Sequence, residues 1–288
     1  MEQDLIHELE NRINQLTRLQ KCVAAYILKD PMQAAFSTVD ELAHAAGTST
    51  TTVIRLALFL GYSGYADFQK SLQEYLMQQA SPSRKLELNT PYQKHRGEID
   101  DIVVEITKMQ IDNINKTFHA LSNDQLMKTE ALVTNAQHIY TCGSRSCSAM
   151  AYHLSHNLDQ MYGKSNYITP NVGEIAETLR RITDKDVVIV ITMARYNQFV
   201  LDVARLAKEK GASIIAVTDS YRSPLTEYAN IIYIAECRSA GFHNAMVAAS
   251  FLTEVIVGVC TMKNPELIKQ NLKQSEKYLS ALGIMSQK

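Results

Sequence analysis

The sequence predicts a small all-helical domain followed by a larger α/β domain with a five-stranded parallel sheet. In residues 1–77 the apolar residues recur at three- and four-residue steps, which is the period of amphipathic helices. Five later stretches are strand-like apolar runs, some of them continuous runs of valine and isoleucine, and helical patterns separate most of the five. Such runs indicate strands that are covered on both faces. We therefore expect a three-layer αβα domain after the helical one.

Composition and charge argue against several classes of protein. The net charge is −1, so no global field attracts nucleic acid or acidic lipid, and any binding of DNA must be local. No uninterrupted apolar stretch is long enough to span a membrane, and the acidic N-terminus lacks the pattern of a signal peptide. We expect a cytoplasmic protein without a membrane partner. Five scattered cysteines predict reduced, mostly buried thiols and no metal site, and nothing indicates a cofactor.

Capping and proline signals bound the first helices. Thr17 is a suitable N-cap for a helix over residues 18–29. This helix must stop at Asp30, because the residue before Pro31 avoids helical dihedrals. An earlier helix carries apolar residues along one face, namely Ile6, Leu9, Ile13 and Leu16.

The next segment predicts two short helices joined by a tight turn. Ser37, followed by Asp40 three residues later, indicates a helix start. Gly47 suits a left-handed helix end, and Ser49 can cap the following helix, which closes at Gly61. Two helices with this spacing either read DNA with the second helix or dock on another protein.

The helix over residues 50–60 is the candidate for DNA recognition, because the first turn of such a helix meets base edges. Its candidate contacts are Ser49, Thr51, Thr52 and Arg55. Residues 1–80 contain six basic residues against nine acidic ones, whereas phosphate contacts need concentrated basic charge. The backbone contacts must therefore come from Arg12, Arg18, Lys21, Arg55 and Lys70.

A domain boundary is predicted where the helical pattern ends. Residues 78–97 are polar, contain two prolines and have no sustained period, as expected for a linker. Residues 98–288 form the second domain, which opens with a long amphipathic helix whose apolar stripe is Ile102, Val103, Ile106, Met109 and Ile114. The strands lie at residues 138–142, 166–169, 186–192, 212–218 and 230–235, and a further helix ends the domain.

These segments together resemble a known family. The stretch "STVDELAHAAGTSTTTVIRLALFLGYSGYADFQ" is similar to the helix-turn-helix of RpiR/MurR-type bacterial transcription regulators, and the downstream half looks like their sugar-isomerase-type (SIS) domain. The resemblance covers about residues 5–280. It implies a DNA-binding domain followed by a SIS domain that binds a phosphosugar. One departure is "LALFLG", where the family usually has one or two basic residues before the final Leu-Gly.

The turn "TCGSRSC" after the first predicted strand has the composition of an anion-binding loop. Gly143 permits a tight turn at the end of the strand. The amides at the start of the next helix, with the hydroxyls of Ser144 and Ser146, form a cradle for an anion, and Arg145 adds a cation. The turn has neither a Walker A pattern nor a nucleophile elbow. A turn of small residues without a ligand is the alternative.

The turn after the third strand departs from the family pattern. In phosphosugar-binding SIS domains a Ser-x-Ser-Gly-x-Ser/Thr stretch holds the phosphate, and the matching residues here run from Thr192 to Asn197. Thr192 keeps that chemistry and Asn197 keeps it in part, whereas the Arg195-Tyr196 pair occurs in only part of the family. Arg145 and Arg195 together favour a ligand that carries a carboxylate or a phosphate. The alternative is that Arg195 pairs with a nearby acidic side chain and binds no ligand.

The resemblance implies that the turn at Thr218, Asp219 and Ser220 approaches the same pocket.

Two further residues, Glu236 and His243, follow the last strand, and SIS isomerases use a glutamate and a histidine for proton transfer. Nothing in the sequence shows that these two residues lie close together. We therefore favour a glutamate whose carboxylate is solvated and a histidine whose imidazole packs or caps a helix. The predicted ligand set contains no catalytic residue and consists of Gly143, Ser144, Arg145, Ser146, Thr192, Arg195, Tyr196, Asn197, Thr218, Asp219 and Ser220.

These observations predict a transcription regulator of a catabolic operon for a sugar or sugar derivative. It binds double-stranded DNA at a palindromic operator and senses a small anion, such as a phosphosugar. We expect a homodimer or homotetramer formed through the C-terminal domain, and its two-fold symmetry would require a near-palindromic operator. The alternatives are a phosphosugar isomerase with a helical accessory domain and a scaffold without DNA or ligand. We expect no enzyme, because the phosphate stretch is eroded and no acid–base pair is assembled.

Overall fold

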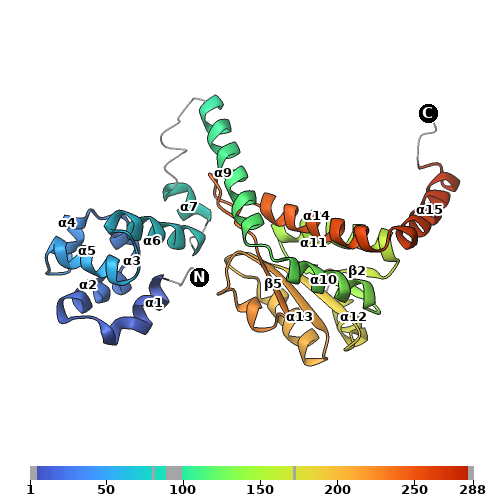
Figure 1. Ribbon diagram of the computed structural model, residues 1–288, viewed down its shortest axis with the longest axis horizontal. Helices are drawn as coiled ribbons and strands as arrows, with labels where there is room; N and C mark the ends of the chain where they lie inside the picture. Colours follow the sequence, from blue (N-terminus) through green and yellow to red (C-terminus); the bar gives the residue numbers. More distant parts are fainter. Residues whose placement is uncertain (1–4, 80–81, 89–98, 171–172, 285–288) are drawn as a thin grey trace. The chain divides into compact units, whose positions relative to one another are not determined.

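The chain divides into two compact units, unit 1 (residues 1–88) and unit 2 (residues 89–288) (Figure 1). The computed structural model describes residues 5–79, 82–88, 99–170 and 173–284. The predicted linker over residues 78–97 lies partly outside the described residues, and its described part includes a short helix, α7 (Pro82–Leu88). Each unit has a hydrophobic core of its own.

Unit 1 is helical throughout its described residues. Its elements are α1 (Leu5–Arg12), the 3₁₀ helix η1 (Ile13–Gln15), α2 (Arg18–Lys29), α3 (Pro31–Phe36), α4 (Val39–Ala45), α5 (Thr50–Phe59), α6 (Tyr65–Gln79) and α7. The buried members of its core include Leu9, Ile27, Leu42, Leu56, Phe68 and Leu72. These side chains come from five different helices, so mutual burial stabilises short helices that are marginal alone.

The boundaries of α2 confirm the predicted capping signals. The Thr17 hydroxyl accepts a hydrogen bond from the Gln20 amide, and the Gln20 side chain accepts one from the Thr17 amide at 3.0 Å. This reciprocal pair is a capping box. Asp30 follows the last residue of α2, and Pro31 begins α3 directly after it.

The predicted start of α4 is wrong by one residue. Ser37 ends α3, and its hydroxyl donates to a carbonyl of that helix at 2.7 Å. The N-cap is Thr38, which accepts from the Glu41 amide, while the Glu41 carboxylate accepts from the Thr38 amide at 2.7 Å. Tyr65 and Gln69 of α6 donate to the Ser37 carbonyl, so contacts with a distant helix hold Ser37 outside the cap.

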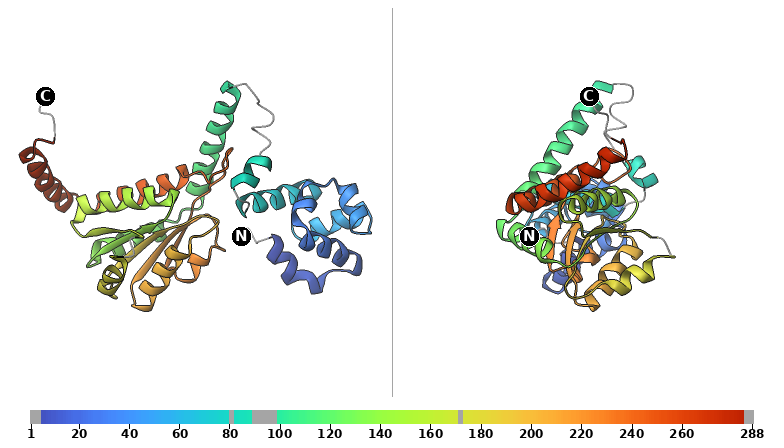
Figure 2. Two further views of the ribbon diagram at one scale, coloured as in Figure 1. Left: turned by 180° about the vertical axis from the view of Figure 1, so that it is seen from behind. Right: turned by 90° about the vertical axis from the view of Figure 1, so that its right-hand side faces the viewer.

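Unit 2 is a three-layer αβα domain with a parallel sheet, as the sequence predicts. The strands are β1 (Ile139–Gly143), β2 (Ser165–Ile168), β3 (Val187–Ile191), β4 (Ser213–Thr218) and β5 (Ile231–Ile234), in the order β2-β1-β3-β4-β5. The helices are α9 (Ile99–His119), α10 (Asn123–Asn135), α11 (Ser146–Tyr162), α12 (Ile175–Arg181), α13 (Gln198–Glu209), η2 (Pro224–Glu227), α14 (Val247–Lys263) and α15 (Pro265–Ala281). Neighbouring strands are all parallel, so their carboxyl ends share one edge of the sheet (Figure 2).

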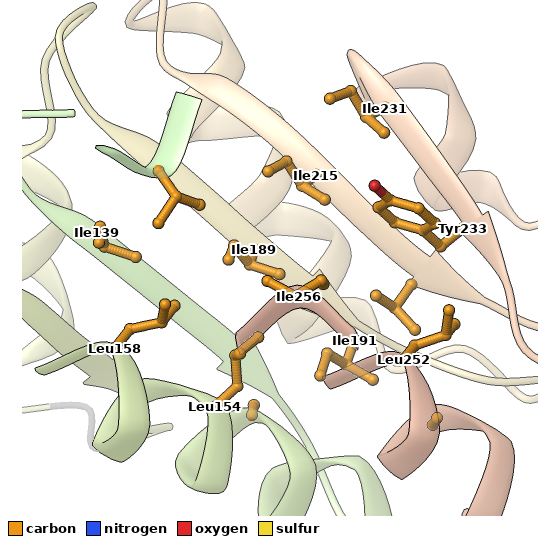
Figure 3. Packing of buried hydrophobic residues seen from close by; sticks show 14 of the residues in the cluster. Ile139, Leu154, Leu158, Ile189, Ile191, Ile215, Ile231, Tyr233, Leu252 and Ile256 are labelled. Carbon is orange, nitrogen blue, oxygen red and sulfur yellow. The ribbon is translucent and has the colours of Figure 1, made fainter. Parts of the chain in front are cut away.

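Helices cover both faces of the sheet, which explains why the central strands β1, β3 and β4 are almost entirely buried. On one face, α11 and α14 pack over Ile189 and Ile191 of β3 (Figure 3). On the other face, α13 packs over Val188 and Val190. Every position of β3 is buried, because successive side chains point into different helical layers.

α9 is the predicted long helix, but its apolar stripe is not the buried face. The buried residues of α9 are Asn113 and Thr117, whereas Val103 and Ile106 of the predicted stripe are 54% and 37% exposed. The Asn113 side chain donates to the Arg238 carbonyl at 2.7 Å, so polar contacts attach α9 to the rest of unit 2. The other three residues of the stripe, Ile102, Met109 and Ile114, are half-buried, so no residue of the predicted stripe is fully buried.

No single helix among the described residues is both long and apolar enough to cross a membrane. The bent pair α14 and α15 passes such a test by length and composition alone, with an angle of 107° between the helices. α14 packs on the sheet, where Ala248, Leu252 and Ile256 are buried.

Candidate functional site

The turn between α4 and α5 is closed by local hydrogen bonds. Gly47 has a φ of 64°, and the amides of Gly47 and Thr48 donate to carbonyls in the last turn of α4 at 3.1 and 2.8 Å. This pairing ends α4 in a left-handed residue, as the sequence predicts. Ser49 caps α5, because its hydroxyl accepts from the Thr52 amide at 3.3 Å.

α5 has one buried face and one exposed face. The core of unit 1 takes up Val53, Leu56 and Ala57. The exposed side chains are Ser49, Thr51, Ile54, Arg55 and Leu58. Thr52 is half-buried, and its hydroxyl lies 3.0 Å from that of Ser49. Among the four predicted DNA contacts, Ser49, Thr51 and Arg55 are therefore exposed, and the Ser49 hydroxyl is paired with that of the half-buried Thr52.

The basic residues that we expected to contact phosphate are not equivalent. The Arg12 guanidinium donates to the Phe59 carbonyl at 3.4 Å and lies 2.9 Å from the Glu8 carboxylate. Arg12 therefore ties α1 to the end of α5. Exposed basic side chains in this unit include Arg18, Lys21, Arg55 and Lys70.

Gly143, the last residue of β1, is required by close packing rather than by a turn. A Cβ atom at this position would lie 2.5 Å from the Cys147 carbonyl oxygen and 3.0 Å from the Ala151 Cβ. The left-handed residue of this turn is Arg145, with a φ of 55° and a ψ of −127°. The tight turn that we expected at Gly143 therefore lies two residues later.

Some of the amides predicted to bind an anion at the start of α11 are already hydrogen-bonded within the turn that follows β1. The amides of Cys147 and Ser148 donate to carbonyls within the turn at 3.1 Å each. Arg145 and Ser146 are exposed, and Ser144 is half-buried. An anion at this turn would therefore meet the Arg145 guanidinium and the Ser146 hydroxyl rather than a full ring of amides.

The turn after β3 holds part of its predicted ligand set inside the protein. Thr192 and Ala194 are 4% and 5% exposed. The Ala194 amide donates to the Asp219 carboxylate at 3.1 Å, and the Asn244 side chain donates to the Ala194 carbonyl at 3.3 Å. The next residue, Arg195, has a φ of 66° and is exposed. The first half of the turn is anchored, and the arginine lies outside it.

Asp219 faces protein groups rather than solvent. Burial raises the pKa of Asp219, while hydrogen bonds from its own amide, from the Ala194 amide and from Tyr196 lower it. Burial and the nearby Asp219 carboxylate raise the pKa of Tyr196. Thr218 is fully buried and its hydroxyl donates to Asp219 at 3.3 Å, whereas Ser220 is half-buried. These contacts favour a positioning role for Asp219 and Tyr196.

The β1 and β3 turns begin side by side on the carboxyl edge of the sheet. β1 and β3 are adjacent, and their register pairs Gly143 with Ile191. The helices that follow them, α11 and α13, cover opposite faces of the sheet. Such a reversal is the switch point at which open α/β sheets bind ligands. In the part of the chain that the structure describes, the non-glycine residues with positive φ are Arg145 and Arg195, one in each turn.

Sequence reasoning missed two side chains that hold these turns in place. Asn244 anchors the Ala194 carbonyl from a position 50 residues away. The Tyr167 hydroxyl of β2 donates to the Gly143 carbonyl at 3.1 Å. Neither residue has a local signal, because its partner is distant in the sequence and the contact depends on sheet order.

A surface pocket of about 660 Å³ lies at the amino edge of the sheet, opposite these turns. Its lining includes Lys185, Asp186, Ser213 and Asn230, which stand at the starts of β3, β4 and β5. The predicted ligand residues do not line it. The pocket therefore does not coincide with the predicted anion site.

Glu236 and His243, which we considered as an acid and a base, both follow β5. The Glu236 amide donates to the Thr117 hydroxyl at 2.9 Å. His243 is exposed, and its ring centroid lies 5.4 Å from that of Phe242. The backbone of Glu236 is thus attached to α9, while the His243 ring is open to solvent.

Comparisons with known proteins agree with this architecture. Residues 3–79 match the helix-turn-helix domain of the rpiR family, and residues 132–258 match the SIS domain. An uncharacterized HTH-type transcriptional regulator of Thermotoga maritima is 22% identical over 97% of this chain and 99% of its own. The HTH-type transcriptional regulator HexR of Escherichia coli is 24% identical over 96% of this chain and 94% of its own.

Solved structures share the fold. The NanR protein of Vibrio vulnificus, complexed with ManNAc-6P, has a TM-score of 0.59 and 21% identity, covering 99% of this chain and 100% of that chain. The sugar isomerase domain of the RpiR transcription factor from Sphaerobacter thermophilus has a TM-score of 0.58 and 22% identity, covering 60% of this chain and 97% of that chain. With both domains matched in this order, the chain belongs to the rpiR family of helix-turn-helix regulators that carry a SIS domain.

Proposed function

We propose that the chain is a DNA-binding transcriptional regulator whose affinity for DNA is controlled by a small anion bound to the SIS domain. The exposed face of α5 carries this proposal, because a capped second helix presents Thr51 and Arg55 to solvent. Relatives that match nearly the whole chain are named HTH-type transcriptional regulators. The predicted role in an operon for sugar catabolism belongs to the same proposal.

The effector in this proposal is a phosphosugar or a similar anion held by Arg145 and Arg195. Both guanidinium groups are exposed, and their turns meet at the switch point of the sheet. A planar guanidinium binds phosphate or carboxylate with two parallel hydrogen bonds, which compensates for the buried hydroxyl of Thr192. NanR, which has the same fold, binds ManNAc-6P.

We further propose that two copies of the chain form a dimer, so that two copies of α5 contact the two halves of a palindromic operator. α9 offers a surface for pairing, because Val104, Ile111 and Phe118 are 50, 54 and 57% exposed and recur every seven residues. Ligand then changes DNA affinity by favouring one of two states of the pair. Analytical ultracentrifugation tests this step, and a monomer at micromolar concentration would contradict it.

A mobility-shift experiment with DNA from upstream of the chain's own gene tests the main proposal. We expect preferential binding to that DNA over unrelated DNA of equal length, and a steep loss of affinity between about 50 and 200 mM salt. Equal affinity for both DNAs would overturn the regulator assignment.

Thermal unfolding with ManNAc-6P and with inorganic phosphate tests the anion site, since a ligand that binds the folded state raises the unfolding temperature.

Phosphosugar isomerase is the second candidate, because the SIS domain shares its fold with a domain described as a sugar isomerase domain. We expect no conversion of aldose phosphates to ketose phosphates by the purified chain. Turnover that disappears in Glu236→Gln and in His243→Ala would favour the enzyme over the regulator.

A further inference from the structure

The exposed face of α5 combines one cation with two aliphatic side chains. Ile54 is 39% exposed and Leu58 is 51% exposed. The opposite face of α5 fills the core, so burial inside unit 1 does not explain either residue. Four side chains share the exposed face at the spacing i, i+3, i+4 and i+7, namely Thr51, Ile54, Arg55 and Leu58.

The charge pattern of α5 is compatible with a polyanionic partner. The helix Thr50–Phe59 contains one basic residue, Arg55, and no acidic residue. Its N-terminus carries the positive end of the helix dipole and is capped by Ser49. It follows α4 after the tight turn at Gly47 inside the region that matches the helix-turn-helix domain, so the proposed function makes it the helix that enters the major groove. The aliphatic residues therefore lie on the face that α5 would turn toward base edges, with Ile54 beside Arg55 after the first turn and Leu58 in the last turn.

The major groove offers one apolar group, the C5-methyl group of thymine. We propose that Ile54 and Leu58 contact thymine methyl groups and that Arg55, on the same face, binds a guanine. Arginine donates two parallel hydrogen bonds to guanine O6 and N7. The operator half-site is then a guanine with thymines on either side, on one strand or the other. This inference rests on the proposed function, because it requires α5 to bind in the major groove.

Replacing thymine by deoxyuridine tests the inference directly, because deoxyuridine keeps the base pair and lacks the methyl group. After footprinting has located the operator in upstream DNA, each thymine of the half-site is replaced in turn in synthetic duplexes. We expect wild-type affinity to fall about fourfold for each contacted methyl group that is removed, the value for burial of one such group.

Variants of the two aliphatic residues complete a double-mutant cycle. Ile54→Ala should bind the thymine and deoxyuridine duplexes equally well at the position that Ile54 contacts, and Leu58→Ala should do so at a second position. Both residues are exposed and alanine favours helix, so both variants should fold, which circular dichroism checks. Leu19→Ala in α2, at a leucine that is 52% exposed, is the matched control and should discriminate as the wild type does.

The outcomes separate this inference from the proposed function. Absence of preferential DNA binding would end both. Preferential binding with affinities that stay within twofold for every deoxyuridine duplex would overturn the methyl contacts and leave the regulator intact. Full discrimination by Ile54→Ala and Leu58→Ala would also overturn them. If these variants change their oligomeric state but still distinguish the thymine duplexes from the deoxyuridine duplexes, Ile54 and Leu58 contact protein rather than DNA.

Discussion

The two candidate sites of this chain are assembled in different ways. The reading face of α5 comes from one stretch, residues 49–60, because helical periodicity places every third or fourth side chain on the same side. The anion-binding turns join residues about 50 positions apart, which meet because β1 and β3 are neighbours in the sheet. A substitution on the exposed face of α5 should therefore change DNA binding alone. A substitution in the turns should also change the stability of unit 2.

Gly143→Ala should give the largest effect, because the new Cβ would lie 2.5 Å from a backbone oxygen of α11. We expect a loss of about 3 kcal/mol in the free energy of unfolding of unit 2, measured by denaturant titration. Gly258→Ala in α14 is the control, since no atom lies within 4 Å of its added Cβ. It should be neutral or stabilise by up to about 1 kcal/mol. Equal stability of both variants would show that α11 does not approach β1 so closely.

Arg55→Ala should weaken preferential DNA binding and leave the anion response unchanged. Loss of a base-contacting arginine costs about 1–3 kcal/mol, which is roughly a 5- to 150-fold rise in the dissociation constant. Arg205→Ala is the control, because Arg205 lies on α13 and pairs with Glu209 at 2.8 Å. A similar loss of affinity in both variants would indicate general charge attraction rather than reading by α5.

Arg145→Gly and Arg195→Gly should move stability and ligand binding in opposite directions. Glycine adopts positive φ without the steric penalty of a side chain, so each variant should raise the free energy of unfolding by about 1 kcal/mol. Each should also lose the rise in unfolding temperature caused by ManNAc-6P or phosphate. Arg195→Lys, which keeps a charge, should retain part of that rise. A variant that is destabilised and still responds to the anion would contradict the assignment.

Thr38→Ala should give the smallest effect, about 1 kcal/mol of unit 1 stability, because it removes the N-cap of α4. Asp40→Ala, two residues later, should change stability by less than about 0.5 kcal/mol. Thermal unfolding of the two variants compares them directly. The reverse order would restore Ser37 and Asp40 as the start of the helix.

Local chemistry made much of the fold predictable. The Thr17 and Ser49 caps and the left-handed Gly47 follow from interactions within a few residues, and the five strands are signalled by short sequence patterns. The cap of α4 was misplaced, because Tyr65 and Gln69 hold Ser37 from another helix. The assignment of the ligand residues and of the domain boundaries stays a prediction.

The sequence by itself determined the type and order of the elements and the two candidate loops, because caps, periodicity and apolar runs act over short distances. Only the tertiary structure decided which of the candidate side chains face solvent. Asp219 and Thr192 are buried among distant partners, and Gly143 allows α11 to approach β1 closely. Val103 and Ile106 of the predicted α9 stripe are exposed. Burial depends on which distant segments pack together, and no local pattern encodes that choice.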